Sequence, residues 1–319
     1  MKFSVPYNGE EYYIEKISNS SLLPFVSEIY FAGNPLIMGS GRRPKIRDFI
    51  VQHKGLIKFD DVKYDDEINR LIKFCVNHKI KCNLLMNFDN VLSNVASSYV
   101  SSLIDKGVSN VTVGSLDLLK QVKNTWSDQI DIQNSVYMEV LSLNNIKDII
   151  ASGVSIFLLP PEFNSNLSTI ENIYKILKVY ENVKFKIMVN EGCINYCPHR
   201  KQDQLDAQEY KVEFAIQDYL NGTENNRVLS HPCRAHMNNR GINRTNFIHP
   251  NDIRKYEKFD PILKIVGRSF DMEKISLIIK SYLACKYNGD LRLIIENFKH
   301  SQSAMYYNTS CKTNFLLEI

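Results

Sequence analysis

Three cysteines with histidines close by in the chain are the residues whose types and spacing best fit metal binding. Cys193 and Cys197 are four residues apart in the segment VNEGCINYCPHR, and Cys233 lies later in SHPCRAHM. A glycine before the first cysteine and a proline after the second favour a tight turn in which both thiols can point at one ion. Thiolates and imidazoles are ligands that zinc and iron–sulfur clusters prefer. We therefore predict a metal centre with Cys193, Cys197 and Cys233 as ligands.

The spacing leaves the fourth ligand and the metal open. A four-thiolate iron–sulfur cluster and a zinc site of three thiolates and one imidazole both fit the pattern. A Cys-x3-Cys-x2-Cys motif is excluded because Arg200 occupies its third position. The alternative of three buried free thiols fits less well, since the residues around them are polar. The candidates for the fourth ligand are His199, His231, His236 and Cys311.

Charged side chains expected near the cysteines form a second group of candidates, for substrate binding or acid–base chemistry. Arg200 and Arg234 offer forked donors to a carboxylate or phosphate, although an ion pair with loop carboxylates accounts for them equally well. Other members of the group follow the ends of predicted strands or, in one case, a glycine-rich stretch whose backbone could cradle an anion. These residues are Glu162, Glu191, Arg268 and Arg42.

The elements that must position these residues alternate along the chain. Short apolar runs rich in β-forming residues are separated by segments with apolar residues at helical spacing. The predicted strands are 28–31, 82–88, 110–113, 131–138, 154–159, 184–189, 246–248 and 263–266. Such alternation favours parallel strands with right-handed crossovers, and eight units close most naturally into an α/β fold of the TIM-like (β/α)8 barrel type. A doubly wound open sheet is the alternative, although no Gly-x-Gly-x-x-Gly follows the first strand.

The domain organisation follows from this pattern. We predict an N-terminal arm over 1–24 and one barrel domain over 25–319, with a cysteine-bearing insertion over 191–245 after strand six. Since active sites of such barrels lie at the carboxyl ends of the strands, the insertion is expected at the functional face.

The composition of the 319-residue chain excludes several classes of protein. With 44% hydrophobic and 23% charged residues, it is neither disordered nor collagen-like. A net charge of +4 gives no strong nucleic-acid signal. The N-terminus lacks the apolar core of a signal peptide, and no run of about 18 apolar residues predicts a membrane span. We therefore expect a cytoplasmic protein.

Several short motifs follow one another in a distinctive order. They are VNEGCINYCPHR, FIHPNDI at 247–253, LKIVGR at 263–268, GSGR at 39–42, LLPPE at 158–162 and MYYN at 305–308. From about residue 25 onward, their order resembles that of the peptidase U32 family. The resemblance implies a barrel-like catalytic domain. In the ubiquinone-biosynthesis and RNA-hydroxylation members it also implies a four-cysteine [4Fe-4S] cluster that supports oxygen-independent hydroxylation. By position, Cys193, Cys197 and Cys233 are similar to cluster cysteines of such members, but no fourth cysteine lies between Cys197 and Cys233.

The sequence therefore leaves three functions open. The first is an iron–sulfur-dependent, hydroxylase-like redox enzyme acting on an unidentified small molecule, peptide or RNA base. The second is a cysteine-type or metal-dependent peptidase, since older members were named as collagenase-like peptidases. The third is a non-catalytic subunit held together by a metal, either zinc or an electron-relay centre. The resemblance permits this third function because ubiquinone-type members act in pairs with a related subunit.

Overall fold

Eight parallel strands close into a barrel in this computed structural model. The structure describes residues 1–38, 49–53, 56–87, 91–138, 140, 142–180, 182–195, 197–200, 202, 205, 216–217, 220, 245–268 and 270–295. The order around the barrel is β1-β10-β9-β8-β7-β6-β5-β2. The strands are β1 (Lys2–Pro6), β2 (Val26–Ala32), β5 (Lys81–Met86), β6 (Asn110–Val113), β7 (Asp131–Asn134), β8 (Ile156–Leu158), β9 (Lys184–Met188) and β10 (Ile262–Lys264). The prediction of a (β/α)8 TIM-like barrel is confirmed.

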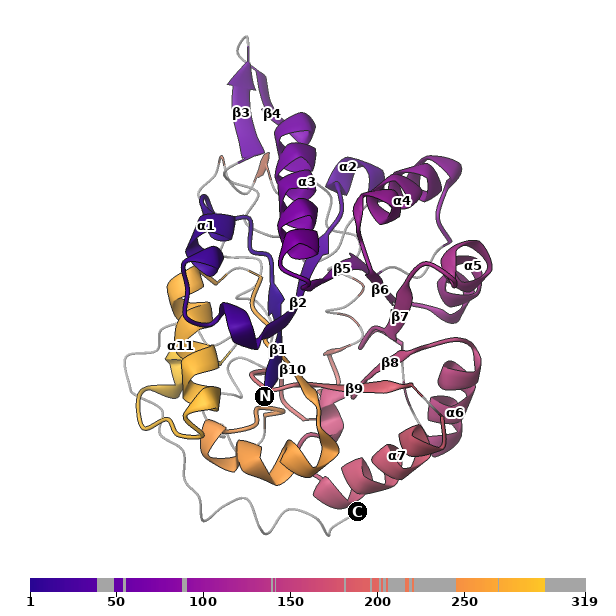
Figure 1. Ribbon diagram of the computed structural model, residues 1–319, viewed down its shortest axis with the longest axis vertical. Helices are drawn as coiled ribbons and strands as arrows, with labels where there is room; N and C mark the ends of the chain where they lie inside the picture. The colour runs from indigo at the N-terminus through magenta and orange to yellow at the C-terminus, as the bar shows by residue number, and fades with distance from the viewer. Residues whose placement is uncertain are drawn as a thin grey trace.

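Helices follow most strands and surround the barrel (Figure 1). The α-helices are α1 (Tyr13–Ser18), α2 (Pro35–Met38), α3 (Asp61–Asn77), α4 (Asn94–Lys106), α5 (Leu116–Trp126), α6 (Leu143–Ala151), α7 (Leu167–Val179) and α11 (Met272–Leu283). Short 3-10 helices are η1 (Leu23–Phe25), η3 (Pro161–Phe163), η6 (Pro250–Phe259) and η7 (Leu291–Leu293). An antiparallel hairpin of β3 (Ile50–His53) and β4 (Leu56–Phe59) extends away from the barrel beside α3 (Figure 1). Within these described ranges, no helix has the length and apolar character that crossing a membrane requires.

Local signals fix where the helices begin and end. Helices α4, α5 and α6 begin after Ser93, Ser115 and Ser142, and each serine oxygen accepts a hydrogen bond from a backbone N–H of the first turn. Glycines follow two of these helices: Gly107 follows α4 with a φ of 123°, and Gly153 follows α6 with a φ of 113°. Both values lie in the left-handed region that favours glycine, so the two glycines determine where these helices end.

Two expectations about the strands are wrong. Residues 1–24 are not an arm outside the barrel, because Lys2–Pro6 forms β1, which pairs with both β10 and β2. The run 246–248 is not a strand, and this region contributes only an isolated bridge between Ile194 and Thr245. The cysteine-bearing insertion therefore follows β9, which is the seventh barrel strand in chain order rather than the sixth. Most of that insertion lies outside the described residues.

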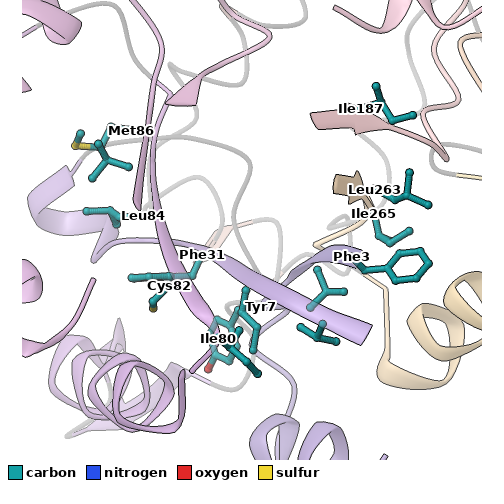
Figure 2. Packing of buried hydrophobic residues seen from close by; sticks show 14 of the residues in the cluster. Phe3, Tyr7, Phe31, Ile80, Cys82, Leu84, Met86, Ile187, Leu263 and Ile265 are labelled. Atoms are coloured by element: carbon teal, nitrogen blue, oxygen red, sulfur yellow. The ribbon is translucent and has the colours of Figure 1, made fainter. Parts of the chain in front are cut away.

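The main core lies between the barrel strands and the surrounding helices. Alternate strand residues point outward and are fully buried there, among them Phe3, Phe31, Cys82 and Ile187. Figure 2 shows these side chains on the strands, together with Tyr7. Burial of this apolar surface is the main stabilising contribution to the fold. Cys75 and Cys82 belong to this core, and both are completely buried.

The interior of the barrel is polar. The Lys186 ammonium on β9 binds the Glu28 carboxylate on β2 at 2.6 Å, and both side chains are almost completely buried. Because β9 and β2 are not neighbours in the barrel, this ion pair crosses its interior. Lys186 also donates to the Gln133 side chain at 2.5 Å, and the Ser4 hydroxyl donates to Glu28 at 2.6 Å. Hydrogen-bonded polar side chains thus occupy the interior of the barrel.

The pKa of Glu28 reflects this network. Burial by itself raises the pKa of the carboxyl, but the charge of Lys186 and the hydrogen bonds from Lys186 and Ser4 lower it to about 2. Burial also lowers the pKa of Lys186, and the charge of Glu28, which acts to raise that pKa, offsets only part of this effect. The short contacts of Lys186 to Glu28 and Gln133 are those of an ionised pair. We therefore treat both groups as charged at neutral pH.

Candidate functional site

Asparagine side chains hold neighbouring strands together at the carboxyl end of the barrel. Asn134, at the end of β7, donates to the Leu158 carbonyl at 2.9 Å and accepts from the Leu158 N–H at 2.7 Å. Asn190, just after β9, makes the same pair of hydrogen bonds with Val266, at 2.8 and 2.7 Å. Each amide therefore acts as an additional peptide group that continues the sheet where the strands diverge. The segment that carries the cysteines begins at this fixed edge.

The base of the cysteine segment is anchored from two further sides. The Asn164 amide donates to the carbonyl oxygens of Met188 and Asn246, both at 2.7 Å. The Tyr282 hydroxyl, from α11, lies 2.9 Å from the Val189 carbonyl oxygen and 2.7 Å from that of Ile248. Both anchors join residues before the cysteines to residues after the insertion. The two ends of the insertion are thus held side by side at the mouth of the barrel.

Cys193 lies directly after this anchored edge. Its N–H donates to the Glu191 carboxylate at 3.2 Å, and its carbonyl accepts from the Asn246 N–H at 2.9 Å. Glu191 itself is buried. The bridge between Ile194 and Thr245 continues this short antiparallel contact. Both the N–H and the carbonyl of Cys193 are therefore hydrogen-bonded, while the residue is partly exposed.

Cys197 and the residues after it form a turn over the neighbouring loop. The Arg200 N–H donates to the Cys197 carbonyl at 3.2 Å. The Arg200 guanidinium forms an ion pair with the Glu162 carboxylate in η3, and the two side chains are only 18% and 19% exposed. This pair joins the loop after β8 to the segment after β9. The Cys197 thiol is partly exposed, and His199 lies at the surface.

The structure brings together some of the residues predicted from the sequence. Cys193, Cys197, Glu191, Glu162 and Arg200 all lie in the segments that follow β8 and β9. For Arg200, the ion pair expected as an alternative is the one observed, with Glu162 as its partner.

Arg268 lies elsewhere on the same rim, in the segment after β10. Burial raises the pKa of Tyr64 well above its usual value, whereas the Arg268 guanidinium acts to lower it. The charge of Arg268 therefore acts on a residue of α3.

Six predicted site residues lie outside the described residues. They are Cys233, His231, His236, Arg234, Cys311 and Arg42. Among the residues that the structure does describe, no three His, Cys, Asp or Glu side chains come together as a metal site. The meeting of Cys233 with Cys193 and Cys197 therefore stays a prediction.

Sequence reasoning missed the asparagines that shape this site. Asn164, Asn190 and Asn246 are buried, and each bonds to a segment distant in sequence or, for Asn246, to the backbone of Cys193. The one available signal is position, because Asn164 and Asn190 closely follow predicted strands, where polar side chains point into the functional end of the barrel. Asn246 was hidden because it falls in a run that resembles a strand.

The fold and this location define a (β/α)8-barrel protein with its candidate site at the carboxyl ends of the strands. No family model matches the chain. The chain is 25% identical over 247 residues to a protein described as "Uncharacterized protease MJ1657" from Methanocaldococcus jannaschii, covering 72% of this chain and 68% of that protein.

Among solved structures, the chain is similar to one described as that of the U32 peptidase Mk0906. The TM-score is 0.52 at 12% identity, and the match covers 84% of this chain and 93% of the other. At this identity the likeness shows a shared fold. The second comparison thus shows a fold shared with a U32 peptidase, and the first adds a likeness to a protein described as a protease.

Proposed function

We propose that this protein is a redox enzyme of the peptidase U32 type, in which Cys193, Cys197 and Cys233 hold an iron–sulfur cluster that serves an oxygen-independent hydroxylation. The observation that carries the proposal is the placement of Cys193 and Cys197. Both thiols are partly exposed in a segment anchored at the mouth of the barrel, where enzymes of this fold build their sites. Anchored, accessible thiols suit a metal centre better than core packing.

The residues present fit such a group in two respects. Two soft sulfur donors lie four residues apart in the chain, and Asn246, whose buried side-chain amide has no hydrogen-bond partner, is paired through its backbone with Cys193. A third ligand has to come from beyond the described residues, and Cys233 is the candidate. [4Fe-4S] is the cluster that the resemblance implies, and zinc is the alternative metal.

A bound cluster would supply one-electron transfer and, at an iron with an open position, a place for an oxygen-bearing substrate. The chain's own residues supply positioning. Glu191 holds the backbone of Cys193, and the Glu162–Arg200 pair fixes the turn after Cys197. Since Arg200 is already neutralised by Glu162, an anionic substrate has to displace that carboxylate to use the guanidinium fork. Arg200 is therefore assigned mainly to holding the loop.

A peptidase is the second candidate, favoured by the names of the two similar proteins. A cysteine peptidase needs a thiolate with an imidazole in hydrogen-bond reach. His199, two residues after Cys197, is the nearest described imidazole along the chain, and it lies at the surface. The redox proposal uses several cysteines together, whereas a cysteine peptidase needs only one.

The test is chemical and uses the full chain purified without oxygen. Iron, acid-labile sulfide and zinc are quantified per chain, and visible and paramagnetic resonance spectra are recorded. The variants are Cys193→Ala, Cys197→Ala and Cys233→Ala. The matched control is Cys285→Ser, which removes another partly buried thiol, just after α11 and outside the cysteine segment.

The proposal predicts iron and sulfide in the native chain and in Cys285→Ser, with a large loss in each of the other three variants. One equivalent of zinc without sulfide would contradict it and indicate a structural metal site or a zinc-dependent subunit. Absence of both metals, together with cleavage of a peptide that thiol reagents block, would establish the peptidase instead.

A further inference from the structure

The side-chain amide of Asn246 is buried without a hydrogen-bond partner. Within the part of the chain that the structure describes, neither its nitrogen nor its oxygen finds a donor or acceptor, although the residue is only 2% exposed. Buried amide groups are normally paired, and an exception calls for an explanation. The backbone of the same residue is fully used, because its N–H donates to Cys193 and its carbonyl accepts from Asn164. The position of Asn246 is thus fixed while its side chain is unsatisfied.

The backbone pairing places Asn246 opposite Cys193. Ile194 pairs with Thr245 in an antiparallel bridge, so Cys193 and Asn246 are the next pair along the same ladder. The hydrogen bond from the Asn246 N–H to the Cys193 carbonyl confirms this register. Residues directly opposite in an antiparallel pair have their side chains on the same face, with Cβ atoms about 5 Å apart. In the structure the Asn246 amide makes no hydrogen bond to the Cys193 sulfur, and a rotation of the amide side chain would bring its N–H to that sulfur.

We infer that the Asn246 side-chain N–H donates a hydrogen bond to the Cys193 sulfur when that sulfur is a metal-bound thiolate. The inference rests on the proposed function only in taking Cys193 as a ligand, and it holds for iron–sulfur, zinc or any other thiolate-bound metal. Asn246 is then a positioning residue that acts through Cys193. Hydrogen bonds of this kind, made to a metal ligand rather than to the metal, tune the properties of metal centres.

The bond has a defined electronic effect. A donor to a thiolate stabilises the lone pairs of sulfur, so it moves the sulfur-to-metal charge-transfer bands to higher energy. In an iron–sulfur centre it also favours the reduced form, which carries one more negative charge. Loss of the donor therefore moves the bands to longer wavelength and lowers the midpoint potential. A tenfold weaker preference for the reduced form corresponds to about 59 mV for a one-electron couple.

The experiment uses Co(II) as a probe, added to the metal-free full chain, with the near-ultraviolet charge-transfer band as readout. Cys193→Ala first establishes that the band includes this sulfur. Asn246→Leu removes the donor at similar volume, and Asn246→Asp keeps the shape but replaces the donor with an acceptor. The matched control is Thr245→Val, which changes the neighbouring residue on the other face of the ladder. Circular dichroism verifies folding of each variant.

The inference predicts a shift to longer wavelength in both Asn246 variants, larger for Asn246→Asp, and no shift in Thr245→Val. An unchanged band in the Asn246 variants overturns it and shows that the amide meets only water. Absence of a cobalt–thiolate band in the native chain overturns it as well. A band that shifts as expected in a chain that acquires no iron or sulfide supports the inference while contradicting the iron–sulfur proposal, so the two failures are distinguishable.

Discussion

The Lys186 ammonium on β9 lies 2.6 Å from the Glu28 carboxylate on β2, across the interior of the barrel. Three other polar side chains complete the pair, since Ser4 and Asn110 donate to Glu28 and Gln133 accepts from Lys186. Strands that are not adjacent in the sheet are thereby joined through the centre of the barrel.

Removal of one member of this pair is expected to be costly. Lys186→Met leaves the Glu28 carboxylate buried without its counter-charge, and we predict a loss of about 3–5 kcal/mol in the free energy of unfolding. Denaturant titration of the variant measures the loss. Lys184→Met on the same strand is the matched control, because Lys184 binds Asp131 at the surface and its loss should cost less than about 1 kcal/mol. Equal losses in the two variants would contradict the assigned role of the interior pair.

Stability should also depend on the ionisation of Glu28. Its pKa in the folded protein is about 2, below the ordinary value of 4.5, so the folded state favours the ionised form. The resulting stabilisation is fully present above about pH 5 and is lost as the pH falls toward 2, with a total of about 3 kcal/mol. Unfolding free energies measured between pH 6 and pH 2.5 test this. In Glu28→Gln this part of the pH dependence should disappear, and its persistence would assign the effect to other carboxylates.

Replacement of the glycines that follow α4 and α6 should destabilise the protein to different degrees. An added Cβ at Gly107 lies 2.4 Å from the Val76 Cγ2, whereas at Gly153 it lies 2.9 Å from the flexible Lys123 side chain. Both alanine variants lose about 1 kcal/mol or more from backbone strain, and Gly107→Ala should lose more because a β-branched valine on a helix has little freedom to move. Urea unfolding of both variants checks the order, and a larger loss for Gly153→Ala would reverse it.

The hydrogen bonds of Asn190 should control the cysteine segment. Asn190→Ala leaves the N–H and carbonyl of Val266 unpaired, which we expect to cost about 1–3 kcal/mol and to loosen the base of that segment. The reaction of Cys193 and Cys197 with a disulfide reagent in the metal-free chain should become faster. Asn134→Ala removes the equivalent bonds between β7 and β8, away from the cysteines. It should lower stability without changing the thiol rates, and a similar acceleration in both variants would indicate a general loosening.

The sequence predicted the barrel because its strands are recognisable one by one. A buried parallel strand such as β8 appears as a short apolar run, and Gly107 and Gly153 mark the helix ends. The strand β1 escaped detection because its inward-facing Ser4 interrupts the apolar pattern. The run 246–248 has the composition of a strand, but no local pattern shows that β1 already fills the eighth place in the barrel.

The types of the candidate site residues were predictable from the sequence, whereas the residues to which they hydrogen-bond were not. Cys193 and Cys197 are conspicuous because thiols in a polar turn have few structural uses. The roles of Asn164 and Asn246 depend on a contact between residues 82 positions apart in the chain. Periodicity and spacing report neighbours along a helix or strand, so a tertiary hydrogen bond of this kind leaves no trace in them.

The pairing of β1 with β10 has a kinetic consequence. Lys2 lies opposite Ile262, so this seam joins residues made at widely separated times on the ribosome. One edge of β1 has to wait until nearly the whole barrel has been synthesised, while its other edge can pair early with β2. Contacts this distant in sequence slow folding, and an open strand edge invites association with other chains. Until the seam closes, a nascent chain therefore keeps one edge of β1 open to association with other chains.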